Sequence, residues 1–176
     1  NQMAFGSAIS PSIAKDEALI QFTIGTGFSF ASVITREQYT ITHLQRKNPG
    51  LNPKTKWKLT QYNEVSKLVS DIRSNLQLTN NKPANFNLEK SSQLFEMLFT
   101  ENMLNIIKDK KKLVIVPDGP LYGLPFELLY DKKNKKWFVE KHAVTVSPSV
   151  YSYVALNLDK KIPYSTAKSF VGFGNP

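Results

Sequence analysis

The stretch from Leu113 to Leu129 (LVIVPDGPLYGLPFELL) constrains the fold more than any other part of the chain. Its first four residues are apolar and mostly β-branched, which predicts a short buried strand. Turns rich in proline and glycine follow at 117–120 and 123–125, and Gly119 can adopt the positive φ that such turns use. A buried strand that runs into an ordered loop is a common place for function in α/β proteins, because the loop lies at the carboxyl end of the strand.

The residues before this stretch predict a β-meander followed by two amphipathic helices. The three strands of the meander are expected at 17–24, 28–35 and 39–44, and the helices at 60–76 and from about 88 to 110. The first helix should be capped by Thr60, and the second by Asn87 or Ser91. The apolar face of the first helix repeats at helical spacing and comprises Tyr62, Val65, Val69, Ile72 and Leu76. Polar loops are expected at 48–58 and 80–87.

The residues after this stretch predict the beginning of a core sheet. A hairpin is expected with arms at 126–130 and 137–139, then a strand at 142–146. A helix should start at Pro148, with Ser147 as its N-cap, and run to about Leu158. A second core strand is expected at 169–174. The whole order predicts an α/β fold.

The string from Pro117 to Leu129 (PDGPLYGLPFELL) resembles the strand–loop signature of CHAT domains, caspase-like relatives of cysteine peptidases that often follow helical TPR repeats. Further segments resemble other parts of that domain, in the same order: Asp16–Ile20 with Phe30–Thr35, Leu94–Leu98, Val144–Ser149 and Val171–Pro176. The resemblance implies a lead-in at 1–15 and the N-terminal portion of one CHAT-like domain at 16–176. Within it, 16–58 would be the meander and loop, 59–110 the helical pair, and 111–176 the first part of a caspase-like αβα sandwich.

The resemblance also implies peptide-bond hydrolysis by a Cys/His dyad in a longer parent protein. In such peptidases both dyad residues lie downstream of the matched segment, and the histidine is followed by glycine. This chain has no cysteine, and neither His43 nor His142 precedes a glycine. No catalytic residue can therefore be assigned, and the chain alone should be inactive because a thiolate nucleophile is missing. It would be a truncated, non-catalytic front half that supplies scaffold; residue 1 is Asn, as expected for an excised or processed piece.

Asp118, Gly119 and Glu127 are the candidate residues for a substrate cleft. The two carboxylates could line a pocket or bind a basic side chain of a substrate. In the simpler alternative, Asp118 accepts hydrogen bonds from the amides of its own turn, and Glu127 bonds to loop amides or to a lysine.

Other polar residues have structural explanations that need no chemistry. His43 and His142 are expected to be surface or strand-edge histidines. A metal site would need a third ligand at a suitable spacing, and none is seen, so neither a metal nor another cofactor is expected. Ser147 lacks the flanking glycines of a nucleophilic serine, so a helix cap is the better interpretation.

The net charge of +9 raises the possibility of nucleic-acid binding. The lysines concentrate at 108–112, where a helix should end, and at 132–136, which has the composition of an exposed hairpin tip. Neither cluster alternates with aromatic residues, so a solvated rim is the preferred interpretation.

No apolar run is long enough to span a membrane, and a cytoplasmic location is favoured. Expected partners are the remainder of the CHAT domain, helical repeats and a peptide or protein substrate; a pseudoenzyme or interaction module and a basic nucleic-acid-binding domain are the alternatives.

Overall fold

A mixed five-stranded sheet organises the residues that the computed structural model describes, namely 9–26, 28–44, 60–76, 78–79, 82–83 and 85–159. In spatial order its strands are β3 (Tyr39–His43), β2 (Ser29–Ile34), β1 (Glu17–Ile24), β6 (Lys112–Val116) and β9 (Ala143–Val146). The first three form an antiparallel meander, whereas β6 and β9 run parallel to β1. The α/β class, the meander and the buried strand of the Leu113–Leu129 stretch are therefore confirmed.

The meander and the core strands meet in the pairing of β1 with β6. Leu19 lies opposite Val114, and Ile20 opposite Ile115, with all four side chains buried. Parallel neighbours need a long crossover connection, which here contains the rest of the meander and three helices. The meander is thus part of the core sheet itself.

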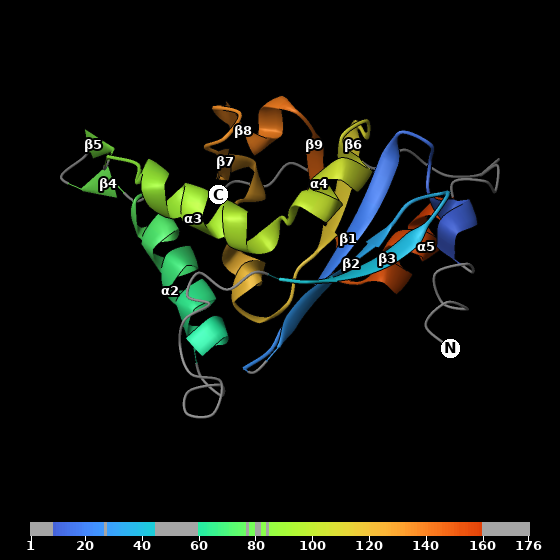
Figure 1. The fold of residues 1–176 in the computed structure, drawn as a ribbon, viewed down its shortest axis with the longest axis horizontal. Helices are drawn as coiled ribbons and strands as arrows, with labels where there is room; N and C mark the ends of the chain where they lie inside the picture. The colour runs from blue at the N-terminus through green and yellow to red at the C-terminus, as the bar shows by residue number, and fades with distance from the viewer. Residues whose placement is uncertain are drawn as a thin grey trace, which may run out of the picture.

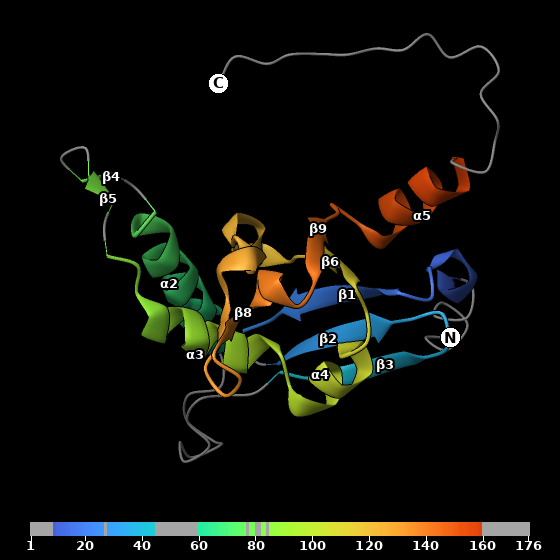
Figure 2. The same ribbon diagram turned by 90° about the horizontal axis from the view of Figure 1, so that it is seen from above.

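Helices cover both faces of this sheet, so the described residues form three layers. One face is covered by α2 (Thr60–Ser74), α3 (Leu88–Leu98) and α4 (Glu101–Ile107), and the other by α5 (Val150–Asp159) and the short 3-10 turn η1 (Ser10–Ser12). Figure 1 shows the sheet with α3 and α4 in front of it, and Figure 2, turned by 90°, shows α5 on the opposite side. No helix in the described part of the chain combines the length and apolar character needed to cross a lipid bilayer.

The larger of the two cores is rich in phenylalanine. Phe22 of β1 packs edge-on against Phe99 and stacks on Phe126, with ring centroids 5.9 and 6.0 Å apart. The ring centroids of Phe138 and Phe99 are 4.6 Å apart. The smaller core, on the α5 side, includes Ile9, Ile13, Leu19, Ile34, Val114, Val116 and Val150. The burial of Ile9 and Ile13 was not expected from the composition of residues 1–15.

The single helix predicted from 88 to 110 is wrong, because the chain breaks between α3 and α4. Thr100 adopts an extended conformation, and its hydroxyl accepts a hydrogen bond from the amide of Met103, so it caps α4. The preceding Phe99 stays buried among the other phenylalanine rings. Asn87 caps α3 as predicted. Ser91 does not cap it; the Ser91 hydroxyl is buried and donates to the carbonyl of Leu128 at 2.6 Å.

Three smaller predictions also need correction. The hairpin around the lysine tip is shorter than expected, with β7 (Tyr130–Asp131) and β8 (Lys136–Trp137) as its arms and 3-10 turns, η3 (Phe126–Leu128) and η4 (Phe138–Glu140), on either side. Ser149, not Ser147, caps α5, because its hydroxyl accepts from the amide of Ser152. The predicted loop at 80–87 contains part of a small ladder, β4 (Leu78–Thr79) with β5 (Lys82–Pro83).

The apolar face predicted for α2 is confirmed in its centre and wrong at its ends. Val65, Val69 and Ile72 are buried, whereas Tyr62 and Leu76 are exposed. The loop predicted at 48–58 and the strand predicted at 169–174 lie outside the described residues.

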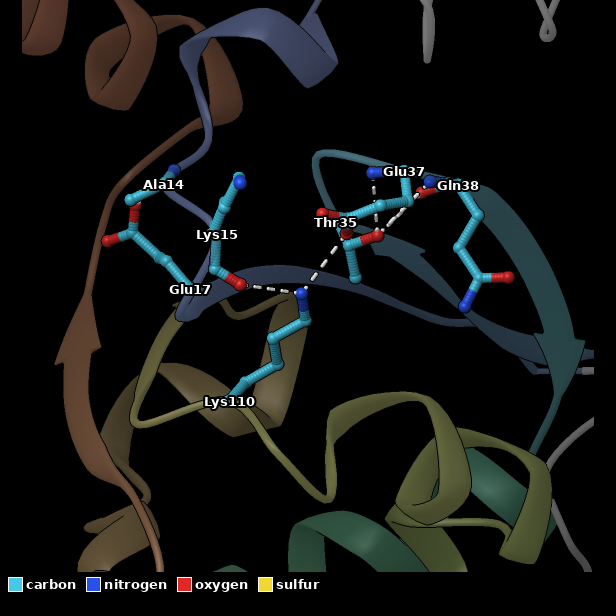
Figure 3. A network of polar contacts seen from close by, with 7 residues as sticks. All are labelled: Ala14, Lys15, Glu17, Thr35, Glu37, Gln38 and Lys110. Carbon is cyan, nitrogen blue, oxygen red and sulfur yellow. Dashed lines mark hydrogen bonds and ion pairs between the residues drawn. The ribbon is translucent and has the colours of Figure 1, made fainter.

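Lys110 links three segments at the end of the sheet where the parallel strands begin. Its ammonium donates to the carbonyl of Lys15 at 2.7 Å and pairs with Glu37 at 3.1 Å, across the turn between β2 and β3 (Figure 3). The Lys110 side chain is largely buried although Glu37 is exposed. The pair lowers the pKa of Glu37. One residue thus links the start of β1, the meander turn and the segment that enters β6.

His142 directly precedes β9 at the same end of the sheet. Of the predicted surface or strand-edge position, the surface part is wrong, because the residue is buried. Only 4% of it is exposed, and its Nδ1 donates to the carbonyl of Lys110 at 2.6 Å. Its ring packs on Phe138, with centroids 5.2 Å apart. Burial lowers the pKa of His142, the bond to the Lys110 carbonyl opposes that shift, and Lys141 adds to it.

We expect this burial to make the fold less stable as the pH falls. The folded-state pKa of His142 lies below the ordinary value of 6.5, so between these two values the unfolded chain binds a proton that the folded chain does not. The free energy of unfolding should therefore decrease from about pH 7.5 to about pH 5.5. Urea denaturation over this range, with the His142→Gln variant as control, should show a weaker pH dependence for the variant. A pKa of 6.5 or higher for His142 by NMR titration would contradict the prediction.

Candidate functional site

A cleft lies beside the loop that follows β6, which we call the signature loop (residues 117–125). The loop begins at the carboxyl end of β6, contains the 3-10 turn η2 (Gly119–Gly123), and packs against α2. The cleft between them has a volume of about 890 Å³. Its lining residues come from α2, from the turn after it and from the loop: Ser66, Val69, Ser70, Arg73, Ser74, Leu76, Gly119, Pro120, Tyr122, Gly123, Leu124 and Pro125.

Asp118 holds the end of β1, rather than the amides of its own turn. Its Oδ2 accepts a hydrogen bond from the amide of Ile24 at 2.8 Å, 94 residues earlier in the chain. The expected Asx-type bond to the turn is therefore wrong. Asp118 is half-buried and does not line the cleft. It fixes the start of the signature loop to the neighbouring strand, and so positions the cleft wall indirectly.

Two glycines allow α2 to approach the signature loop closely. Gly119 has a φ of +51°, as its place in the turn predicts, and a Cβ there would lie 3.1 Å from the ring of Tyr62. Gly123 lies under the guanidinium of Arg73, and a Cβ at that position would be 2.6 Å from Nη1. A side chain at either position would push the helix residue away from the loop.

Arg73 was not singled out from the sequence, although it is the one charged side chain among the described residues that line the cleft. Ser66, Ser70 and Ser74 lie at intervals of four residues on α2 and line the cleft together with Arg73. This spacing, next to the apolar positions Val65, Val69 and Ile72, was the only signal available, and it is also typical of an ordinary solvated helix face.

Glu127 lies on η3, just beyond the loop, and does not line the cleft. It is half-buried, and its carboxylate has no hydrogen bond or ion pair with any residue in the described ranges. Neither the predicted bond to loop amides nor the one to a lysine is therefore formed there. Of the three predicted cleft residues, the structure brings only Gly119 to the cleft.

The remaining candidates for chemistry occupy structural positions. Ser147 donates to the carbonyl of Ser149 at 2.9 Å, and His43 is exposed on β3. Within the described ranges, no three His, Asp or Glu side chains are grouped so that they could hold a metal ion.

The lysines of the hairpin tip are partly neutralised by acidic residues of the helices. Lys132 pairs with Glu89 at 2.9 Å, and Lys133 with Glu101 at 3.2 Å. The pair raises the pKa of Lys132. At the base of the tip, Asp131 is buried, bonds to Asn134 and pairs with Lys141 at 2.9 Å. The exposed pairs of Lys132 and Lys133 contribute little to stability, but they reduce the free positive charge at the tip.

The described residues of the cleft therefore offer hydroxyl donors, backbone groups and one cation, and among them no nucleophile is paired to a base. Such a surface can bind a ligand and orient it, but the described residues around it supply no group for covalent catalysis.

Comparison with known protein families places part of this chain in a known domain family. The family model of the CHAT domain matches residues 88–176, half of the chain, from the start of α3 through the signature loop and beyond. A search of curated proteins finds no match to this chain.

We expect Asp118→Ala to loosen the junction between β1 and the signature loop. Loss of a charged acceptor from a partly buried amide should lower the free energy of unfolding by about 1–3 kcal/mol. Urea denaturation measures this change, and hydrogen exchange should show faster exchange of the Ile24 amide. Asp118→Asn keeps a side-chain carbonyl in place and should lose less. Unchanged exchange at Ile24 in the alanine variant would show that this bond does not hold the strand.

Proposed function

The chain belongs to the CHAT family and is a caspase-like, peptidase-related domain, and from this we propose that it is the non-catalytic front half of a cysteine peptidase domain. In this proposal it supplies scaffold and one wall of the substrate cleft. The observation that carries the proposal is the cleft of about 890 Å³ between α2 and the signature loop, at the carboxyl end of β6. Ligands of open α/β sheets bind at that end of the strands.

The catalytic groups would come from polypeptide that follows this chain in a longer parent protein. A cysteine thiolate would attack the scissile carbonyl, a histidine would transfer protons, and backbone amides would stabilise the oxyanion. The chain itself has no cysteine. Its contribution would be to bind the peptide and keep the cleft wall rigid through the bond from Ile24 to Asp118.

The far edge of the sheet supports a role as part of a larger domain. β9 is an edge strand of the described sheet, and Val146 at its end is half exposed. On α5, Tyr151 and Leu156 are 83% and 64% exposed. In folded proteins, edge strands are usually protected, and large exposed apolar side chains often mark a contact with another segment or protein. The remainder of the CHAT domain is the partner that we propose for this region.

A protein-interaction module is the second candidate function. The exposed apolar residues of α5 favour it, because such residues can bind another protein. In that case the scaffold would present the cleft as a docking surface, without hydrolysis, as a pseudoenzyme does.

Expression of the complete open reading frame distinguishes the two functions. If this is a peptidase domain, the frame encodes a His-Gly strand end and a strand-end cysteine after residue 176, and the full-length protein cleaves a proteome-derived peptide library. Replacing that cysteine with alanine should abolish cleavage, and the 176-residue chain alone should cleave nothing, because it lacks the nucleophile. A frame without this pair of residues would refute the peptidase function and favour the interaction module.

A further inference from the structure

We propose that the cleft between α2 and the signature loop binds an acidic segment of an extended peptide, with Arg73 as the partner of its carboxylate. The inference deepens the proposed function, on which it rests for the view that this cleft receives a peptide. It adds the chemical class of the ligand and the residue that selects it.

Arg73 is held where a ligand in the cleft would meet it. Its guanidinium lies against Gly123, so close that a Cβ on that glycine would lie within 2.6 Å of Nη1 and 3.2 Å of Cδ. Gly123 does not have a positive φ, so its backbone conformation does not demand a glycine, and the close approach of Arg73 accounts for its lack of a side chain. Arg73 also lies in the last turn of α2, where a cation is stabilised by the helix dipole before any ligand binds.

The positive charge of Arg73 is not neutralised within the described part of the cleft. No carboxylate is among its lining residues. The nearest acidic residue in sequence, Asp71, pairs with Lys90 at 2.5 Å, and Asp118 accepts from the amide of Ile24. The neighbouring serines Ser66 and Ser70 bring hydroxyls that can donate to an anion. A cation, hydroxyl donors and no acidic side chain together select for an anionic group.

The surroundings of Arg73 favour a peptide over a nucleic acid. A nucleic acid needs several cations along its backbone, whereas the described residues that line this cleft include one, and the lysine clusters at 108–112 and 132–136 do not line it. Leu76 and Tyr122 line the cleft and are 49% and 64% exposed, so apolar side chains next to an acidic residue could pack there. The volume of about 890 Å³ lies within the range of ligand sites.

Direct binding to the purified 176-residue chain tests the proposal. The probes are a fluorescein-labelled peptide with a Leu-Asp-Leu core and its Leu-Asn-Leu counterpart, measured by fluorescence anisotropy. We expect the Asp peptide to bind about tenfold more tightly than the Asn peptide, because a guanidinium–carboxylate bond is charge-assisted. Arg73→Gln should remove that difference, and Arg73→Lys should retain part of it, because lysine keeps the charge and loses the planar fork.

Arg36→Gln is the matched control, since it also removes one positive charge. Arg36 lies in the turn between β2 and β3, near the start of β1, whereas the cleft lies at the carboxyl end of β6. This variant should bind both peptides as the unmodified chain does. Circular dichroism melting establishes that each variant is folded; if Arg73→Gln does not fold, Gly123→Ala, which displaces the guanidinium, replaces it in the comparison.

Equal binding of the Asp and Asn peptides, no binding of either, or full binding by folded Arg73→Gln would each overturn the proposal. Binding of a single-stranded oligonucleotide through Arg73 in place of the Asp peptide would also overturn it. Because no cleavage is measured, failure of the full-length protein to hydrolyse peptides would refute the proposed peptidase function and leave this result standing. If the full-length protein cleaves peptides without preference for acidic ones, and the Asp and Asn peptides bind equally, the peptidase function stands and the acidic-peptide proposal is refuted.

Discussion

The parallel pairing of β1 with β6 is the interaction on which the rest of the structure depends. It places the meander inside the core sheet, and it brings buried residues from two distant segments of the chain into one register. Contacts at both ends of this pair of strands hold it in place. Where the two strands begin, Lys110 donates to the carbonyl of Lys15. Where they end, Asp118 accepts a hydrogen bond from the amide of Ile24. Because strands of fixed register carry their end loops with them, the position of the signature loop follows from this pairing.

The cleft depends on how the crossover helices return to that loop. α2 packs on the signature loop at two glycines, and α3 is attached to the next turn by the hydrogen bond from Ser91 to the carbonyl of Leu128. Neither contact involves a catalytic group. The one charged side chain among the described residues that line the cleft, Arg73, lies on α2 rather than on the signature loop.

Local patterns in the sequence predicted the elements, and long-range contacts decided what they failed to predict. The β-branched run of β6, the periodicity of α2 and the turn at Gly119 depend on neighbouring residues, so they were predicted correctly. The break at Thr100 was missed because Phe99 is held by rings from other elements. His142 and Asp118 were placed wrongly because their partners, Lys110 and Ile24, lie 32 and 94 residues away. Arg73 was overlooked because an arginine on a polar helix face has no distinguishing pattern until the loop that it faces is known.

The distance in sequence between β1 and β6 also has a consequence for the order of folding. The meander consists of neighbouring strands joined by short turns, so it can form from local contacts as soon as it is synthesised. β3 ends at His43 and β6 ends at Val116, so the pairing of β1 with β6 must wait until about 70 further residues, the helices included, have left the ribosome. Contacts of such high contact order form slowly. Until then the edge of β1 that pairs with β6 has no neighbouring strand. The nascent chain therefore passes through a period in which this strand edge is open, and open strand edges promote aggregation.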